Sequence, residues 1–217
     1  MRFRTHKAPP PPRVVKMGES EPSLTHDMRV LDFDLENRPL SYWYDGNTTG
    51  EITAFGWSWV GEDHVSTMLL TRNGTYEDED GVEHPPAKAV RRFRDILSDA
   101  DMVTGHYIRK HDLPMLQAAM LEYGIEFLPP LLTQDTHGDL PKRKDLSVSQ
   151  ENLSAMFDLP EPKHNMTQTE WRKANRLTTE GIASARKRVV DDVLQHKALR
   201  EELLNRGLLG VPKRWKP

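Results

Sequence analysis

Cysteine is absent from this chain of 217 residues. Its absence excludes disulfide bonds, thiolate metal sites and catalysis by a thiol. The sequence also has no apolar run as long as a membrane span, and its first residues lack the apolar core of a signal peptide. We therefore expect a cytoplasmic protein with no membrane partner.

A strong charge of one sign is missing as well. The chain has 30 Lys and Arg residues against 33 Asp and Glu residues, which gives a formal net charge of −3 at pH 7. This balance gives no general argument for binding to nucleic acid. It does not exclude a nuclease, because the reaction centre of a nuclease needs carboxylates and its basic groups need only line the groove.

The length is sufficient for one domain with its own apolar core. Residues 1–27 are rich in proline and polar residues and carry basic side chains, so we expect a flexible tail, with a docking arm as the alternative. The folded domain is expected over residues 28–207. Residues 208–217 form a basic C-terminal tail that either binds a partner or packs on the sheet.

Apolar periodicity predicts an α/β fold with a mixed five-stranded sheet flanked by helices. The expected strands lie near residues 28–38, 51–60, 64–71, 102–104 and 131–136. The expected helices lie near residues 87–98, 112–123, 149–157, 169–175 and 179–205. In this order three antiparallel strands come first, and parallel strands joined by helices follow. The acidic run 77–81 lacks the spacing of a calcium loop, so we interpret it as a solvated connection.

The first strand carries three acidic residues among its apolar ones. Side chains alternate between the two faces of a strand, so one face carries all the carboxylates, those of Asp32, Asp34 and Glu36. Three like charges on a buried strand need a cation against them, and a hard divalent metal is the usual candidate. The alternative is a half-exposed edge strand with its acidic face in water.

Two further carboxylates occupy positions from which they can join this group. Asp112 falls between a strand end and a helix start, where it can also serve as a helix N-cap with Pro114 in the first turn. Asp192 lies in the inward stripe of the last helix. A buried Asp needs a partner, and Arg188, one turn earlier, is the alternative to a metal.

Taken together, three segments resemble the exonuclease motifs of the DEDD superfamily, the 3′–5′ exonucleases of the ribonuclease H-like fold. They are Asp34-Leu35-Glu36, the stretch 105–114, and Asp192-Val193. The resemblance covers residues 29–205. It is closest to the exonuclease domains of family B DNA polymerases and to stand-alone phage-encoded exonucleases.

The resemblance implies a ribonuclease H-like fold and a pair of Mg²⁺ or Mn²⁺ ions held by Asp34, Glu36, Asp112 and Asp192. It further implies hydrolysis of phosphodiester bonds from the 3′ end of single-stranded or frayed DNA, in phage-type replication, repair or recombination. The location would then be the host cytoplasm.

The sequence departs from the family at one catalytic position. The family usually has a Tyr four residues, or a His five residues, before the last Asp, whereas this chain has Arg188 and Lys187 there. Neither is a plausible general base at neutral pH. His196, one turn further along the helix, is our candidate for that role, and His137 is the alternative. Asp32 and Arg188 are expected to contact the metal ligands without binding the metal themselves. If the register of the strand differs, Asp32 and Asp34 are the metal-binding pair.

A 3′–5′ exonuclease must also hold a frayed strand through cations and stacking side chains. The candidates for nucleic-acid binding are His106, Tyr107, Lys163, Trp171 and Arg172. Two alternatives stay open. One is a 3′–5′ exoribonuclease of the same fold, and the other is a catalytically weak or inactive domain that binds nucleic acid or a polymerase or replication partner.

Overall fold

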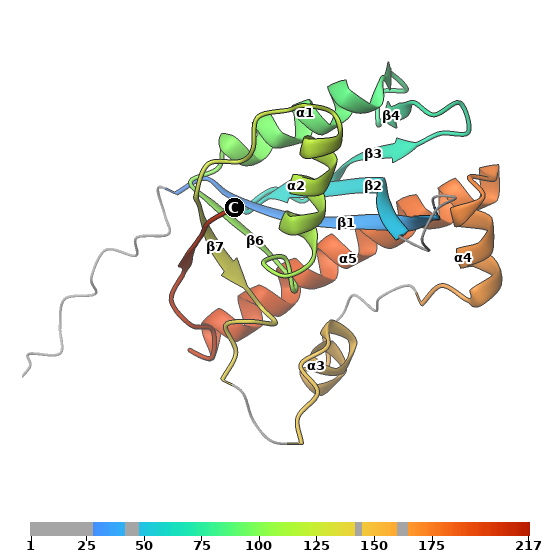
Figure 1. Ribbon diagram of the computed structural model, residues 1–217. Helices are drawn as coiled ribbons and strands as arrows, with labels where there is room; N and C mark the ends of the chain where they lie inside the picture. The colour runs from blue at the N-terminus through green and yellow to red at the C-terminus, as the bar shows by residue number, and fades with distance from the viewer. Residues whose placement is uncertain (1–27, 42–47, 142–144, 160–164) are drawn as a thin grey trace, which may run out of the picture.

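The computed structural model describes residues 28–41, 48–141, 145–159 and 165–217. Within these ranges a single mixed sheet runs through the molecule, with helices on both of its faces (Figure 1). The tail expected over residues 1–27 lies outside the described residues. No helix in the described ranges is both long enough and apolar enough to cross a membrane.

The sheet has eight strands among the described residues, in the order β5-β4-β3-β2-β1-β6-β7-β8. From β1 to β5 each strand pairs antiparallel with the next. On the other side of β1, β6 pairs parallel with β1, β7 pairs parallel with β6, and β8 pairs antiparallel with β7. The bounds are β1 Val30–Ser41, β2 Thr48–Trp59, β3 Ser66–Leu70, β4 Tyr76–Asp78, β5 Glu83–His84, β6 Met102–Gly105, β7 Leu131–Asp135 and β8 Lys213–Trp215.

The five strands expected from the sequence are all present, but the expected total of five is wrong. Strand β4 overlaps the acidic run 77–81, for which a solvated connection is expected, and β5 follows that run. There the buried carboxylate of Asp78 accepts hydrogen bonds from the Val82 N–H (2.9 Å) and the Arg92 guanidinium (2.8 Å), and it lies 2.9 Å from His84 Nε2. Strand β8 comes from the C-terminal segment and is fixed by a hydrogen bond from Thr133 Oγ1 to the Lys213 carbonyl (2.8 Å). These short polar strands have no apolar period, so tertiary pairing alone defines them.

Five helices are described, and each begins and ends within one residue of the range expected from its apolar pattern. They are α1 Pro86–Ser98, α2 Asp112–Glu122, α3 Gln150–Met156, α4 Gln168–Asn175 and α5 Thr179–Asn205. Helix α5 begins after Thr178, whose hydroxyl accepts the Gly181 N–H at 3.1 Å and so caps the helix. It then crosses behind β1, β2 and β3, while α1 and α2 cover the opposite face (Figure 1).

Strand β1 alternates between two environments, as its sequence predicts. Its apolar residues Leu31, Phe33 and Leu35 belong to the main core with α1 and α2, where Phe33 meets Phe93 edge-on. Its acidic residues face α5 instead. A shift in the pairing register with β2 follows directly after Glu36, so the strand is regular over the acidic positions and irregular beyond them.

A glycine sets the distance between the sheet and α5. Gly56 of β2 pairs with Asp34 of β1, and a Cβ at this glycine would lie 2.7 Å from Val189 Cγ2. A side chain at this position would force Val189 to shift. The close approach therefore brings the middle of α5, one turn beyond Val189, against the acidic face of β1.

Candidate metal centre

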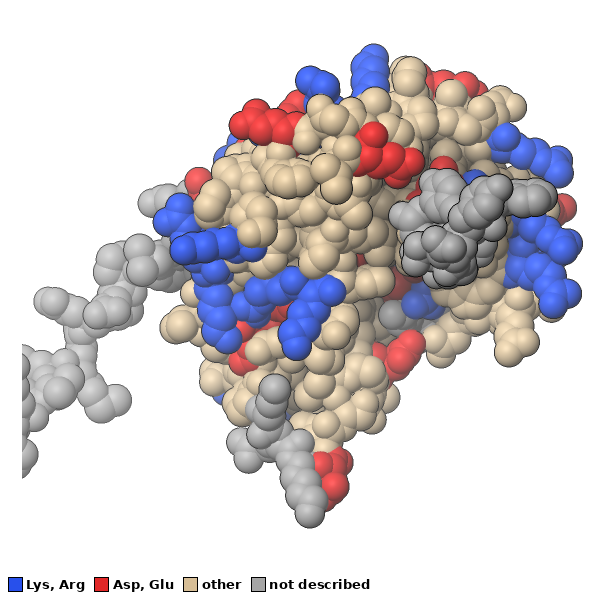
Figure 2. Space-filling view, in the orientation of Figure 1, with Lys and Arg blue, Asp and Glu red and all other residues tan. Residues whose placement is uncertain are grey.

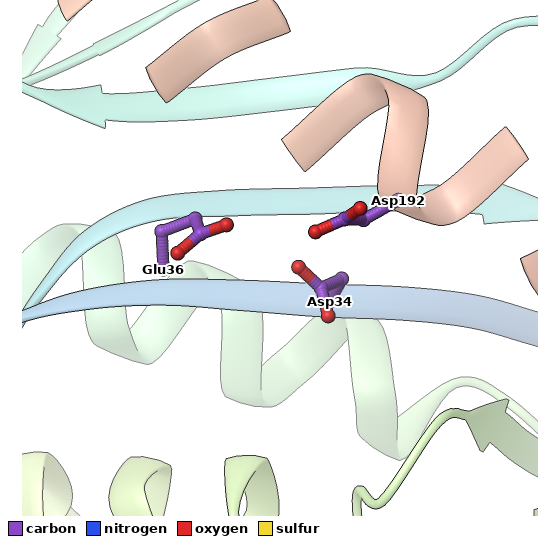
Figure 3. Close-up of side chains that lie close together, drawn as sticks. All are labelled: Asp34, Glu36 and Asp192. Atoms are coloured by element: carbon purple, nitrogen blue, oxygen red, sulfur yellow. The ribbon is translucent and has the colours of Figure 1, made fainter. Parts of the chain in front are cut away.

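Three carboxylates from two elements converge between β1 and α5. Asp34 and Glu36 come from neighbouring inward positions of β1, and Asp192 comes from the buried face of α5 (Figure 3). One oxygen from each lies within 4.8 Å of the others, which is close enough for a single cation to contact all three. Carboxylate oxygens are the ligands that Mg²⁺ and Mn²⁺ prefer. This cluster of three acidic residues can therefore hold a metal ion.

Arg188 of α5 lies beside the same carboxylates. Its Nε is 2.7 Å from Glu36 Oε1, and its terminal nitrogen is 3.3 Å from Asp192 Oδ2. Burial alone would lower the pKa of Arg188, but Asp192 and Glu36 raise it above its ordinary value, so the guanidinium stays charged. Local helical spacing predicted the pair with Asp192. The pair with Glu36, from a strand 152 positions earlier, could be found only in the fold.

Asp32 and His196 form a second buried pair, one turn of α5 beyond Asp192. The Nδ1 of His196 is 3.0 Å from Asp32 Oδ1, and both residues are at most 2% exposed. Asp32 also lines a cavity of about 530 Å³ together with Arg200. Burial lowers the pKa of Arg200, and the negative charge of Asp32 partly offsets this lowering. The Nδ1 of His196 and Oδ1 of Asp32 are close, but their geometry does not make a hydrogen bond. The role of His196 in activating water stays a prediction.

Asp112 approaches β1 from the face that carries α2. Its Oδ1 accepts the Leu35 backbone N–H at 3.1 Å, between the two metal-ligand candidates of β1. Burial raises the pKa of Asp112 to about 7, and the negative charge of Glu36 contributes to the rise. Helix α2 begins at Asp112 with His111 in the N-cap position, so the Asp112 side chain ties α2 to the strand rather than capping its own helix. Its role as a fourth metal ligand stays a prediction.

The loop that leads to Asp112 is held by a residue that the sequence analysis missed. Oδ1 of Asp135, at the end of β7, accepts the backbone N–H groups of Tyr107, His137 and Gly138 at 2.9–3.0 Å. Its Oδ2 accepts the Arg109 N–H at 3.2 Å. An Asp directly after a predicted strand is a usual place for such a contact, but the segment was considered only for His137.

The nucleic-acid candidates separate into two places. His106 and Tyr107 lie with His137, which meets the Tyr107 ring at 4.5 Å, along a shallow cavity of about 370 Å³ that extends to residues 147–151. Tyr107 is 39% exposed and has a φ of 70°, so the loop turns this ring outward.

The second place is α4, which carries Trp171 and the exposed Arg172. The Arg188 guanidinium lies 5.3 Å from the centre of the Trp171 ring, so this aromatic side chain adjoins the carboxylates. Basic side chains gather at the side of the molecule where Figure 1 draws α4 (Figure 2). Lys163 lies outside the described residues.

No protein-family profile matches the chain, and no curated protein is similar to it in sequence. Among solved structures it resembles the family B DNA polymerase from the hyperthermophilic archaeon Pyrobaculum calidifontis, with a TM-score of 0.56 and 15% sequence identity over 82% of this chain. The chain corresponds to 24% of that polymerase's length. At this identity the similarity shows the fold alone, which is broadly consistent with a ribonuclease H-like architecture.

Proposed function

We propose that this protein is a metal-dependent 3′–5′ exonuclease that hydrolyses phosphodiester bonds from the 3′ end of single-stranded or frayed DNA. The observation that carries the proposal is the convergence of Asp34, Glu36 and Asp192 on a fold similar to that of part of a family B DNA polymerase. Such an activity serves DNA replication, repair or recombination, with a polymerase as a natural partner.

The residues present fit Mg²⁺ or Mn²⁺. Asp34, Glu36 and Asp192 offer only oxygen ligands, and their clustered negative charge already attracts the cation of Arg188. Asp112, which accepts the Leu35 backbone N–H, is the candidate for a fourth carboxylate. Bound ions would supply an activated water and stabilise the leaving 3′ oxygen.

The surrounding side chains have separate tasks in this proposal. Tyr107 and Trp171 offer ring faces on which unpaired bases can stack, and Arg172 offers a cation to the backbone. Asp135 keeps the loop that carries Tyr107 and leads to Asp112 in one conformation through its four hydrogen bonds. His196, whose Nδ1 lies 3.0 Å from Asp32 Oδ1, is the candidate that orients or deprotonates water.

One observation favours a second candidate function. Arg188 occupies the helix position at which exonucleases of the DEDD superfamily usually have a Tyr. It pairs with Glu36 and Asp192, two of the three clustered carboxylates. A domain of this kind that has lost its activity would still bind single-stranded nucleic acid. Direct measurement of cleavage separates the two functions.

The experiment uses a single-stranded DNA labelled at its 5′ end, incubated with the full chain and Mg²⁺ or Mn²⁺. We expect a ladder that shortens from the 3′ end and disappears in the double variant Asp34→Asn/Glu36→Gln. The matched control is Asp191→Asn, which removes a carboxylate adjacent to Asp192 that pairs with Lys187 instead. This control should keep the ladder.

Two other outcomes are informative. Metal-dependent shortening of an RNA strand of the same sequence, without shortening of the DNA, would favour the exoribonuclease. Binding of the DNA without any metal-dependent shortening would refute the exonuclease and support the inactive domain.

A further inference from the structure

The guanidinium of Arg188 is placed where a metal ion would compete with it. It contacts Glu36 on β1 and Asp192 on α5, so it bridges the two elements that form the carboxylate cluster. Its side chain is only 13% exposed. A cation in this position offsets the repulsion among three carboxylates that lie within 4.8 Å of one another.

A divalent ion bound to the same carboxylates would meet this resident charge at short range. Two cations a few ångströms apart repel strongly in a partly buried site, where solvent screens them weakly. The ion and the guanidinium also draw on the same two carboxylates, because Glu36 and Asp192 each pair with Arg188 and belong to the cluster that can hold a metal ion. Repulsion between the two cations therefore favours a position of Arg188 away from at least one of these carboxylates.

Trp171 of α4 can retain the guanidinium when it leaves the carboxylates. The Arg188 guanidinium carbon already lies over the Trp171 ring, 5.3 Å from its centre. A guanidinium that stays over this aromatic face keeps a favourable cation–π contact. From there its planar donors can bind a phosphate with two parallel hydrogen bonds, which a lysine does not reproduce.

We infer that Arg188 is an internal counter-ion of the carboxylate cluster that metal ions displace and that substrate phosphate then binds, so that metal and nucleic acid bind cooperatively. The inference rests on the proposed function, because it takes the cluster as a metal site. It gives Arg188 the role of a positioning residue that links the two ligands. Since binding linkage is reciprocal, each ligand must tighten the other by the same factor.

The test measures the dissociation constant of Mn²⁺ by titration calorimetry, for the full chain alone and with a single-stranded DNA whose phosphorothioate linkages resist cleavage. The variant is Arg188→Gln, which keeps a hydrogen-bonding side chain but no charge. We expect it to bind Mn²⁺ alone roughly tenfold more tightly, because a unit charge close to the ion is removed. We expect the DNA to tighten Mn²⁺ binding to the wild type by a similar factor and to leave the variant nearly unchanged.

The matched control is Lys187→Gln, since Lys187 precedes Arg188 on the same helix but pairs with Asp191. This variant should behave like the wild type. A second measurement needs no substitution: the NMR signal of the Arg188 Nε–H, which donates to Glu36, should shift on addition of Mg²⁺.

Equal or weaker Mn²⁺ binding by Arg188→Gln, an unmoved Nε–H signal, or no Mn²⁺ binding by either protein overturns the inference. If Arg188→Gln tightens Mn²⁺ binding but no protein shortens DNA, the exonuclease proposal fails and the competition between Arg188 and metal stands. If the wild type shortens DNA and Arg188→Gln leaves the Mn²⁺ affinity unchanged, the inference alone fails.

Discussion

Gly56 is the residue through which the packing of the sheet controls the carboxylate cluster. In the variant Gly56→Ala, the new Cβ would lie 2.7 Å from Val189 Cγ2 and 3.2 Å from the Val189 carbonyl oxygen. Overpacking of this kind costs about 1–3 kcal/mol, while alanine regains about 0.5–1 kcal/mol relative to glycine within a strand. We therefore expect the free energy of unfolding to fall by about 1–2 kcal/mol, as measured by urea denaturation.

A second substitution, at Val189, tests whether the clash is the cause of the lost stability. Val189→Ala removes the methyl groups that the new Cβ would meet and on its own loses core packing. If the clash is the cause, the double variant Gly56→Ala/Val189→Ala is more stable than the sum of the two single effects by about 1 kcal/mol. Strictly additive losses, or wild-type stability of Gly56→Ala, would refute the argument. Because α5 carries Asp192, Gly56→Ala should also weaken Mn²⁺ binding, and the double variant should restore it.

Two further predictions concern residues outside the cluster. Hydrogen bonds from His84, the Val82 N–H and Arg92 lower the pKa of Asp78 to about 2 despite its burial. The ionised carboxylate therefore stabilises the fold at pH values above the ordinary carboxyl pKa, and this stabilisation is lost as the pH falls through about 2. The stability difference between wild type and Asp78→Asn should therefore shrink as urea titrations move from about pH 5 to about pH 2, and a constant difference would count against this assignment. Asp135→Ala removes the acceptor of four backbone N–H groups, those of Tyr107, Arg109, His137 and Gly138. We therefore expect the free energy of unfolding to fall by about 2–3 kcal/mol and amide exchange in this loop to become faster. Unchanged exchange at Tyr107 would contradict the role of Asp135.

The sequence was sufficient to predict the elements that carry the centre. The period-two pattern of β1 separates its acidic face from its apolar face, and the structure confirms that separation. The helical stripe of α5 likewise predicted that Asp192 points inward, and this residue is buried beside β1. Both signals are local, because they depend only on the repeat of one strand or one helix.

The contacts that complete the site are not local. The pairs of Glu36 with Arg188 and of Asp32 with His196 join β1 to a helix more than 150 positions later, and no spacing rule connects such residues. Asp135 binds the loop near Tyr107 only because β7 ends beside β6 in the sheet. Strand β8 has three residues and no apolar period, so its pairing with β7 is visible only once the sheet is assembled.

The most direct test of the account is to locate bound metal in crystals of the protein grown with Mn²⁺ and a short single-stranded DNA. Anomalous diffraction at the manganese edge should give a peak that contacts the carboxylates of Asp34, Glu36 and Asp192, with the guanidinium of Arg188 turned away from them. The peak should be missing from crystals of Asp34→Asn/Glu36→Gln. Peaks only elsewhere on the protein, or none while Arg188 still bridges Glu36 and Asp192, would contradict the claim that this cluster is the metal centre of a nuclease.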